Sequence, residues 1–385
     1  MAFFLAFKEV WRNRGRFFLF SLVIALITTL VLFIAALAEG LATANREYFS
    51  KLDAELIVFQ ENVDLSANTS QIGRSLLPKI RNVEGVADAG AIGLSAAAVV
   101  SPVKGDKQVD VSLIGVEPDK PGAPPVLGGR ELRSTLANEV VIDQKLARDL
   151  GVKPGDTIRI KTIQGVEDKF FNLRVIGVTD SREYLFRPSI FVPYRAWDQI
   201  RPQANPSIIK PELIFNIVAV QLDDPQQAAQ VSDRIRAEVR NVDVSDVQTA
   251  IKAIPGYTAQ QSTLNTQQVF TLLIGVLVIG GFFQIQMLQK VPQIGVLKAI
   301  GVSNLTVGAA AVLQIILVTT FGVLMGSVVT LALALGIPGN VPIIFDGTLV
   351  AIAIVSLLSI GPLGGLVTVR LAISVEPLIA LGLSS

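Results

Sequence analysis

Side chains that could carry out chemistry are few and scattered in this 385-residue chain. The sequence has no His and no Cys, which excludes thiol nucleophiles, disulfides, Cys/His zinc sites and His-based acid–base catalysis. Glu139, Asp143, Asp149 and Asp156 are the acids that lie closest together in a turn-rich region. We interpret them as solvated turn carboxylates rather than metal ligands, so the sequence predicts no catalytic site, no metal site and no cofactor.

Nucleotide-binding and hydrolase motifs are also missing. The sequence contains no G-x-x-x-x-G-K-[ST], G-x-S-x-G or H-E-x-x-H run, and its Gly-Gly pairs lack the context of a phosphate-binding loop. The net charge of +1 offers no basic surface for a nucleic acid. Any energy that the protein uses must therefore come from a partner.

Apolar segments dominate the rest of the chain. Hydrophobic residues make up 51% of it and charged residues 17%, and no charged residue occurs from Ala299 to Phe345. A bilayer core about 30 Å thick needs about 20 apolar residues in a helix. Four segments meet this requirement, and they predict a membrane protein with four transmembrane α-helices: 17–40, 263–289 (which begins as a stalk), 304–335 and 348–370.

Basic residues predict how these segments cross the membrane, because Lys and Arg concentrate on the cytoplasmic side. They lie before the first segment, between the second and third, and after the fourth: Lys8, Arg12, Arg14, Arg16, Lys290, Lys298 and Arg370. The 336–347 connection has none, as expected of an outer loop. We therefore expect cytoplasmic termini, with an amphipathic helix in 1–16 and a tail at 371–385. A cleaved signal peptide is the alternative for the first segment, but its apolar stretch is longer than a signal peptide needs.

Residues 41–262 are then expected outside the cytoplasm as one large α+β domain. Two β-α-β units, in about 41–100 and 213–254, predict an α+β part, with helices at 70–82 and 226–240. The region between them, about 101–212, is rich in Gly and Pro and predicts an inserted β part. Its expected strands are 109–115, 139–142, 157–162, 170–179 and 189–192. Polar residues 39–52 and 255–270 predict helices that extend the first two spans outward as a stalk.

A few polar or small residues lie inside the apolar segments. Glu39 ends the first span, where its side chain can reach water or face a substrate at a lateral opening. Buried amides in lipid usually bond across helices, so we expect Gln284, Gln286 and Gln314 at a helix interface, with a dimer contact as the first hypothesis. The Gly322-x-x-x-Gly326 spacing likewise permits close helix packing.

The segment 290–303 on the inner side predicts a short amphipathic helix. Ile294, Leu297 and Ile300 recur at a spacing of three residues, which gives one apolar stripe. Pro292 suits the first turn of a helix and Gly301 suits its end. Such a helix can lie in the membrane interface or bind another protein, and periodicity leaves both open.

Three motifs resemble one family. The run 293–303 (QIGVLKAIGVS) resembles the REIGxLKAxGAS signature of FtsX/MacB-like, or type VII, permeases of ABC transporters. The run 370–381 (RLAISVEPLIAL) resembles the family's RxxxxxPxxAL ending, and 7–19 (FKEVWRNRGRFFL) resembles its AxxxLxRxKxRxxL start. One departure is that Pro-Gln stands at 292–293 in place of Arg-Glu. Residues 37–41 with 53–59 look closest to the HrtB branch, and DevC-like exporters also vary at the Arg-Glu position.

The resemblance implies a MacB-like outer domain and a separate ATPase, present in two copies, that binds ATP and Mg. It implies a homodimer or a heterodimer with a similar permease in the inner or plasma membrane of a bacterium, with a periplasmic adaptor in some contexts. ATP-driven motion would be transmitted to the outer domain and would export a lipid, peptide, drug or haem. The residues implied to contact the ATPase are Pro292, Gln293, Ile294, Gly295, Leu297, Lys298, Ala299, Ile300 and Gly301.

Two other functions stay open at this point. Like FtsX, the chain could regulate an extracytoplasmic enzyme such as a cell-wall hydrolase and transport nothing. It could also be a membrane-anchored sensor or enzyme, although the missing His, Cys and catalytic motifs argue against catalysis by this chain.

Overall fold

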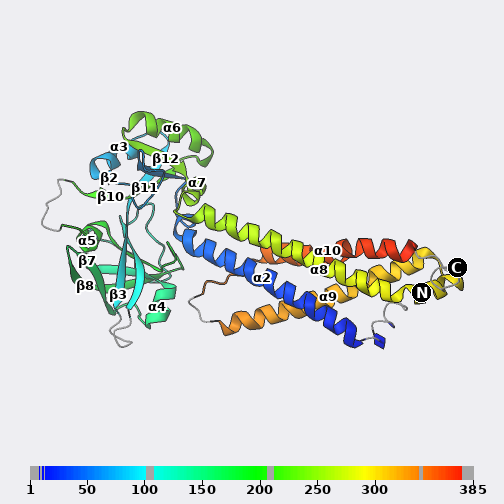
Figure 1. Ribbon diagram of the computed structural model, residues 1–385. Coiled ribbons are helices and arrows are strands. Elements are labelled where there is room, and N and C mark those ends of the chain that lie inside the picture. Colours follow the sequence, from blue (N-terminus) through cyan, green and yellow to red (C-terminus); the bar gives the residue numbers. More distant parts are fainter. Residues whose placement is uncertain are drawn as a thin grey trace. The chain divides into compact units, whose positions relative to one another are not determined.

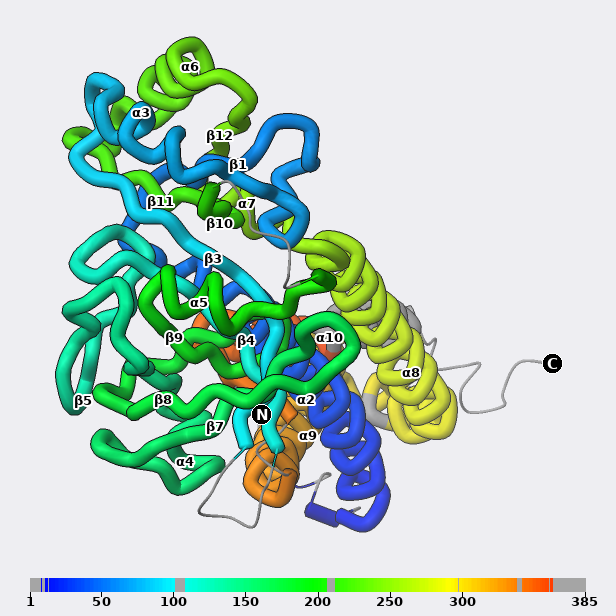
Figure 2. The backbone as a smooth tube through the Cα atoms, turned by 90° about the vertical axis from the view of Figure 1, so that its left-hand side faces the viewer, coloured from blue at the N-terminus to red at the C-terminus, as the bar shows by residue number. Residues whose placement is uncertain are grey.

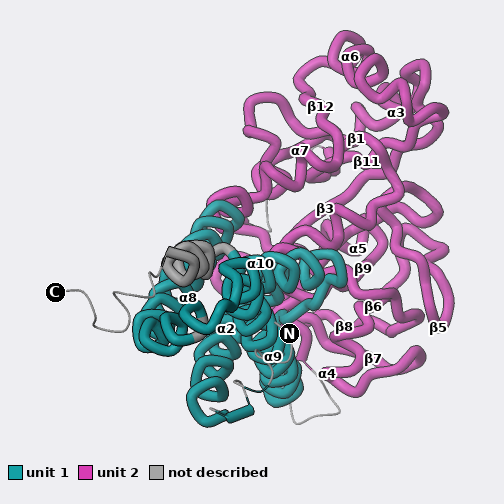
Figure 3. The backbone as a smooth tube through the Cα atoms, turned by 90° about the vertical axis from the view of Figure 1, so that its right-hand side faces the viewer, with its two compact units in different colours: residues 1–41, 261–385 teal, residues 42–260 magenta. Residues whose placement is uncertain are grey.

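A computed structural model describes residues 8, 11–12, 14–100, 108–205, 212–337 and 341–374. The predicted N-terminal helix in 1–16 and the tail at 371–385 fall largely outside these residues. The chain divides into two compact units, residues 1–41 with 261–385 and residues 42–260 (Figure 3). Each unit is considered by itself below.

Unit 42–260 is built on a ten-stranded sheet with the strand order β12-β1-β11-β3-β4-β9-β6-β8-β5, to which β7 adds by pairing with β3 and β8. Its strands are β1 Leu56–Gln60, β3 Val86–Val100, β4 Gln108–Val116, β5 Gly128–Gly129, β6 Glu139–Asp143, β7 Thr157–Gln164, β8 Glu167–Thr179, β9 Ser189–Pro193, β11 Ile217–Leu222 and β12 Val242–Asp246. A second sheet pairs β2 Ile72–Gly73 with β10 Ile214–Phe215.

The long strand β3 joins the two predicted parts into one sheet. Its first half pairs with β11 and its second half with β4 and β7 (Figure 2). Both predicted β-α-β units are present, because β1, β3, β11 and β12 lie together at one end of the sheet. The five strands expected in 101–212 are confirmed as β4, β6, β7, β8 and β9.

Helices pack over the apolar side chains of the sheet and bury them. Helices α3 Leu77–Arg81 and α6 Ala228–Glu238 pack one apolar cluster against β1, β11 and β12 (Figure 1). Helices α4 Gln144–Leu150 and α5 Tyr194–Ile200 pack a second cluster against the strands of the middle region. A third cluster combines α7 Val247–Lys252 with Tyr48 and Phe49.

The helix predicted at 70–82 is wrong in its first half. Ile72–Gly73 forms β2, a 3-10 turn follows at Arg74–Leu76, and only Leu77–Arg81 is α-helical. Pairing with β10 competes for the first residues, and Pro78 fits the first turn of a helix but not its interior.

Unit 1–41 with 261–385 is helical: α2 Arg14–Ser50, α8 Tyr257–Ala299, α9 Asn304–Gly336 and α10 Gly347–Ser374. Within the described residues, three helices are long and apolar enough to cross a membrane, namely α2, α8 and α9. The described apolar part of α10, Gly347–Ser359, is shorter. As predicted, α2 extends the first span to Ser50, and α8 begins at Tyr257 ahead of the second.

The predicted separate helix at 290–303 is corrected by the structure. Helix α8 runs without a break to Ala299 and carries Pro292 in its interior. Proline removes one backbone hydrogen bond, which neighbouring helices can compensate in a packed bundle. The predicted end of the helix is confirmed, since Gly301 has φ +94° and its N–H donates to Lys298 O over 3.0 Å.

Candidate functional site

The end of α8 exposes a mostly uncharged surface. Val296 is 48% exposed and Ile300 73%, while Pro292, Gln293 and Ala299 are also exposed. Gln293, Val296 and Ile300 follow one another at spacings of three and four residues, so they share one face of the helix. The predicted stripe is therefore divided: Ile300 is on the surface, whereas Ile294 is buried.

The opposite face of the same segment is fixed to α9. Ile294 packs with Met287 of α8 and with Val307 and Ala311 of α9. Lys290 Nζ donates to Gln314 Oε1 over 3.0 Å. These contacts join the end of α8 to the start of α9.

Helix α9 is joined in turn to α2 through its glycines. A Cβ at Gly322 would lie 2.6 Å from Ile24 Cβ, and one at Gly326 would lie 2.6 Å from Ala25 O, so only glycine permits this approach. Two hydrogen bonds cross the contact: Ser21 Oγ donates to Val318 O over 3.3 Å, and Thr29 Oγ1 to Gly326 O over 3.2 Å.

The other polar and small residues predicted inside the membrane segments differ in burial and in packing. Gln286 and Gln314 are buried within this single chain, and Gln284 is exposed. Gly322 and Gly326 pack against α2 of the same chain. Glu39 is half-buried. It lies three residues after Ala36, whose carbonyl oxygen accepts a hydrogen bond from Ile344 N over 3.1 Å.

Two of the acids singled out in the turn-rich region bind backbone N–H groups, and a third pairs with an arginine. Asp143 accepts from Lys145 N over 2.6 Å and from Arg182 N over 2.7 Å. Asp156 accepts from Lys153 N over 2.7 Å, and Glu139 pairs with Arg130. Within the described residues no group of three or more acids is arranged to hold a metal ion.

Asp143 has a raised pKa. It is fully buried, and burial raises its pKa to about 6, against the hydrogen bonds from Arg182 and Lys145, which lower it; the charges of Glu183 and Glu47 raise it further. Its carboxylate caps α4 and anchors the loop at Arg182.

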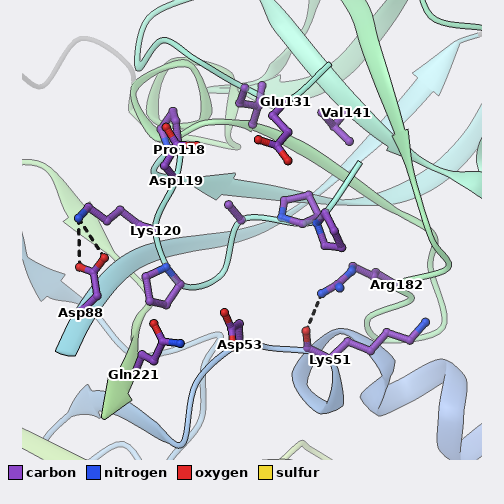
Figure 4. Close-up of a pocket in the computed structure, with 15 residues that line it drawn as sticks. Lys51, Asp53, Asp88, Pro118, Asp119, Lys120, Glu131, Val141, Arg182 and Gln221 are labelled. Atoms are coloured by element: carbon purple, nitrogen blue, oxygen red, sulfur yellow. Dashed lines mark hydrogen bonds and ion pairs between the residues drawn. The ribbon is translucent and has the colours of Figure 1, made fainter. Parts of the chain in front are cut away.

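A cavity of about 480 Å³ opens in unit 42–260 (Figure 4). Its wall mixes acids, bases and prolines: Lys51, Asp53, Asp88, Pro118, Asp119, Lys120, Pro121, Ala123, Pro124, Pro125, Glu131, Leu132, Val141, Arg182 and Gln221. Lys120 Nζ pairs with Asp88 over 3.0 Å, and Arg182 Nη1 donates to Lys51 O over 2.7 Å. The wall therefore includes the point where α2 ends.

Sequence reasoning missed the loop 180–187, which meets the end of α2. Its residues lie about 130 positions from their partners, and no periodicity predicts that pairing. The one available signal is the dense mixture of charged and aromatic residues in DSREYLFR.

Two family models match the chain. The MacB-like periplasmic core domain matches residues 17–238, and the FtsX-like permease C-terminal region matches residues 268–377. A Staphylococcus haemolyticus protein named putative hemin transport system permease protein HrtB is 27% identical over 378 residues, covering 98% of this chain and 99% of that protein. An uncharacterized ABC transporter permease of Mycobacterium tuberculosis is 24% identical over 392 residues, with the same coverage.

Among solved structures, the periplasmic region of MacB from Actinobacillus actinomycetemcomitans aligns with a TM-score of 0.37 and 15% identity, over 52% of this chain and 91% of that one. The match to the MacB-like model alone covers more than half of the chain. The chain belongs to the family with a MacB-like periplasmic core domain and an FtsX-like permease region, and it is the permease subunit of an ABC transporter.

Proposed function

We propose that this permease couples ATP hydrolysis by a separate ATPase to movement of its extracytoplasmic domain, and that this movement exports or extracts a hydrophobic substrate. The observation that carries the proposal is the surface at the end of α8. It is exposed and largely apolar, and its other side is fixed to α9. A surface of this kind is suited to receive a push from a partner protein.

The proposed arrangement has four spans with both termini in the cytoplasm. The distribution of Lys and Arg supports it, as does the absence of charge from Ala299 to Phe345. The absence of Cys allows a direct test with a single Cys at Val166, which is fully exposed in unit 42–260. A membrane-impermeant maleimide should label this Cys in intact cells or spheroplasts. Labelling only after lysis would mean that unit 42–260 faces the cytoplasm and that the proposed topology is wrong.

The proposed partners are two ATPase subunits and a second permease, identical or similar, with an adaptor where an outer membrane is present. The ATPase would contact the segment Pro292–Gly301. Its exposed members are Pro292, Gln293, Val296, Ala299 and Ile300. The family's Arg-Glu pair is absent here, so apolar contact would provide more of the binding.

The proposed route of the push follows contacts within the helical unit. It enters at the end of α8, passes to α9 through Ile294 and the Lys290–Gln314 hydrogen bond, and reaches α2 through Gly322 and Gly326. Each step is a packed contact, and packed contacts transmit displacement because protein interiors compress little.

Haem is one substrate to test first, because a relative is named as a putative hemin transport permease. This chain has no His and no Cys, so any iron ligand would come from Tyr, Met or a carboxylate. A lipid, a peptide or a drug fits the proposal equally well and belongs in the same panel.

The decisive experiment is co-expression with a candidate ABC ATPase from the same organism, followed by purification in nanodiscs. We expect a stable complex whose ATPase activity is stimulated by one compound of the panel. Ile300→Asp should reduce recovery of the ATPase at least tenfold, whereas Val166→Asp, at another exposed apolar residue, should not. Stimulation only by a cell-wall hydrolase would favour the regulatory function instead, and an intact complex with Ile300→Asp would place the ATPase elsewhere.

A further inference from the structure

The strongest unexplained feature of unit 42–260 is the way its loop 180–187 holds the end of α2. We propose that this loop, together with residues 44–51, forms a clamp that makes α2 the driving lever of the extracytoplasmic domain, with Glu47 as its positioning residue. The inference rests on the proposed function, because a lever matters only if the helices move. Below, "the α2 clamp" means residues 44–51 and 180–187.

Main-chain hydrogen bonds tie the loop into the helix itself. Tyr48 N donates to Glu183 O over 3.0 Å, and Phe186 N donates to Ala44 O over 3.1 Å. In a regular helix the N–H of residue 48 bonds the carbonyl of residue 44. Here both groups also hold the loop, so one turn of α2 cannot rotate or slide without breaking bonds to the domain.

The loop adopts a costly conformation to make these bonds. Leu185 and Phe186 have φ of 51° and 61°, in the left-handed region, and neither is glycine. Tyr184 and Arg187 exchange backbone hydrogen bonds of 3.0 and 3.2 Å across this tight turn. Side chains other than glycine cost about 1–2 kcal/mol per residue in the left-handed region, and such strain concentrates at functional positions.

Charged groups join the two parts of the clamp at Glu47. Its carboxylate pairs with Lys51 Nζ over 2.8 Å and accepts from Ser181 Oγ over 2.9 Å and from Glu183 N over 3.1 Å. Only 13% of the Glu47 side chain is exposed. A largely buried carboxylate with partners on both the helix and the loop fixes the position of the helix relative to the loop.

A second layer of pairs surrounds Glu47. Asp180 pairs with Lys51 over 3.1 Å and with Arg182 over 2.8 Å. The pKa of Asp180 is lowered by its hydrogen bonds from Arg182 and Lys51, which outweigh burial. Arg182 Nη1 also donates to Lys51 O, one residue past the end of α2. Lys145 pairs with Glu183, which links the clamp to α4.

Aromatic packing closes the inner side of the clamp. The ring centroids of Phe49 and Tyr184 are 5.3 Å apart, and those of Tyr48 and Phe191 are 5.7 Å apart. Tyr48 is fully buried and Phe49 is 1% exposed. The last turns of α2 are therefore part of the hydrophobic core of the domain, so a displacement of α2 must displace that core.

The test uses two spin labels in this naturally Cys-free chain, at Val166→Cys in unit 42–260 and Leu335→Cys at the end of α9. Both positions are exposed, at 100% and 90%. In the complex with the ATPase in nanodiscs, ATP with vanadate should shift the distance between the labels. Glu47→Gln should reduce this shift at least twofold and leave ATPase activity within twofold of wild type. Ser181→Ala, which removes one hydrogen bond to Glu47, should have a smaller effect and is the milder variant if Glu47→Gln folds poorly.

Glu117→Gln is the matched control. Glu117 has a similar exposure of 17%, pairs with Arg81 and lies outside the clamp. The inference is overturned if Glu47→Gln and Ser181→Ala keep the full distance shift, or if Glu117→Gln loses it equally. If the wild-type complex itself shows no ATP-dependent shift, the proposed function fails instead, so the two failures are distinguishable.

Discussion

The two helices that meet unit 42–260 are attached to it in different ways. Helix α2 ends inside the core, held by the α2 clamp and by buried Tyr48 and Phe49. Helix α8 begins at Tyr257, directly after Gly256, whose φ is +78° and where an added Cβ would meet no other atom within 4 Å. The two connections, α2 and α8, can therefore play unequal roles: α2 is fixed to the domain, and α8 is attached through a glycine.

A side-chain hydrogen bond joins the two attachments. Arg46 Nη1 donates to Tyr257 OH over 3.0 Å. Tyr257 itself is 8% exposed, but the next residues of α8, Thr258 and Ala259, are already exposed. At its start α8 contributes Tyr257 to the core, whereas the last two turns of α2 contribute Tyr48 and Phe49.

The largest expected effect is at Phe49. Phe49→Ala removes a fully buried ring from the core where α2 ends, and such a truncation typically costs about 3–5 kcal/mol. Thermal unfolding of the permease in nanodiscs, with hydrogen exchange across 42–60, measures this loss. Phe170→Ala, at a ring that is 51% exposed, should cost less than about 1 kcal/mol. Equal losses would mean that α2 is not part of the core.

The second effect concerns pH and Asp143, which holds loop 180–187 at Arg182. Burial raises the pKa of Asp143 from 3.8 to about 6, so the folded state binds more protons than the unfolded state between these values. Its contribution to stability therefore falls as pH rises from about 4 to 6 and is constant above that range.

Asp143→Asn cannot titrate and should escape this loss. Its stability relative to wild type should rise by about 2 kcal/mol between pH 4 and pH 7. The lost hydrogen-bond acceptor adds an offset that does not depend on pH. Unfolding midpoints at several pH values measure the difference, and a relative stability that stays flat across this range would show that Asp143 is ionised throughout.

Local pattern predicted much of this fold, and long-range pairing explains what it missed. The alternation in 109–115 and 170–179 places β4 and β8 correctly, because the side chains of a strand repeat every two residues. The 70–82 segment has a helical pattern, yet pairing with β10 draws Ile72 into a strand. A partner about 140 residues away leaves no local signal.

The candidate site shows the same limit. The position of the α8 surface and its end at Gly301 could be predicted from Pro292–Gly301, but not which face is covered, because Val307 and Ala311 of α9 decide that. The α2 clamp depends on backbone atoms of Ala44 and Phe186. Backbone groups are common to all residues, so the sequence cannot single them out.

The third prediction tests whether the push from the ATPase reaches α2 through α9. Gly326→Ala would place a Cβ 2.6 Å from Ala25 O and from Thr28 Cβ, and overpacking of this kind costs about 1–3 kcal/mol. The two helices should separate, which lowers the unfolding temperature and weakens the ATP-dependent label shift. Gly281→Ala in α8, where the added Cβ meets no atom within 4 Å, is the control. A normal label shift with Gly326→Ala would show that α2 is driven by another route.

The smallest expected effect is at the attachment of α8. Gly256→Ala meets no neighbouring atom, so its cost is confined to the left-handed backbone, about 1–2 kcal/mol. Gly128→Ala, also in open space but without positive φ, should cost almost nothing. If α2 is the driving helix, stiffening Gly256 should leave the ATP-dependent label shift nearly unchanged. If the shift disappears with Gly256→Ala and survives Glu47→Gln, the roles are reversed: α8 moves the domain about its glycine, and the α2 clamp only holds a passive support.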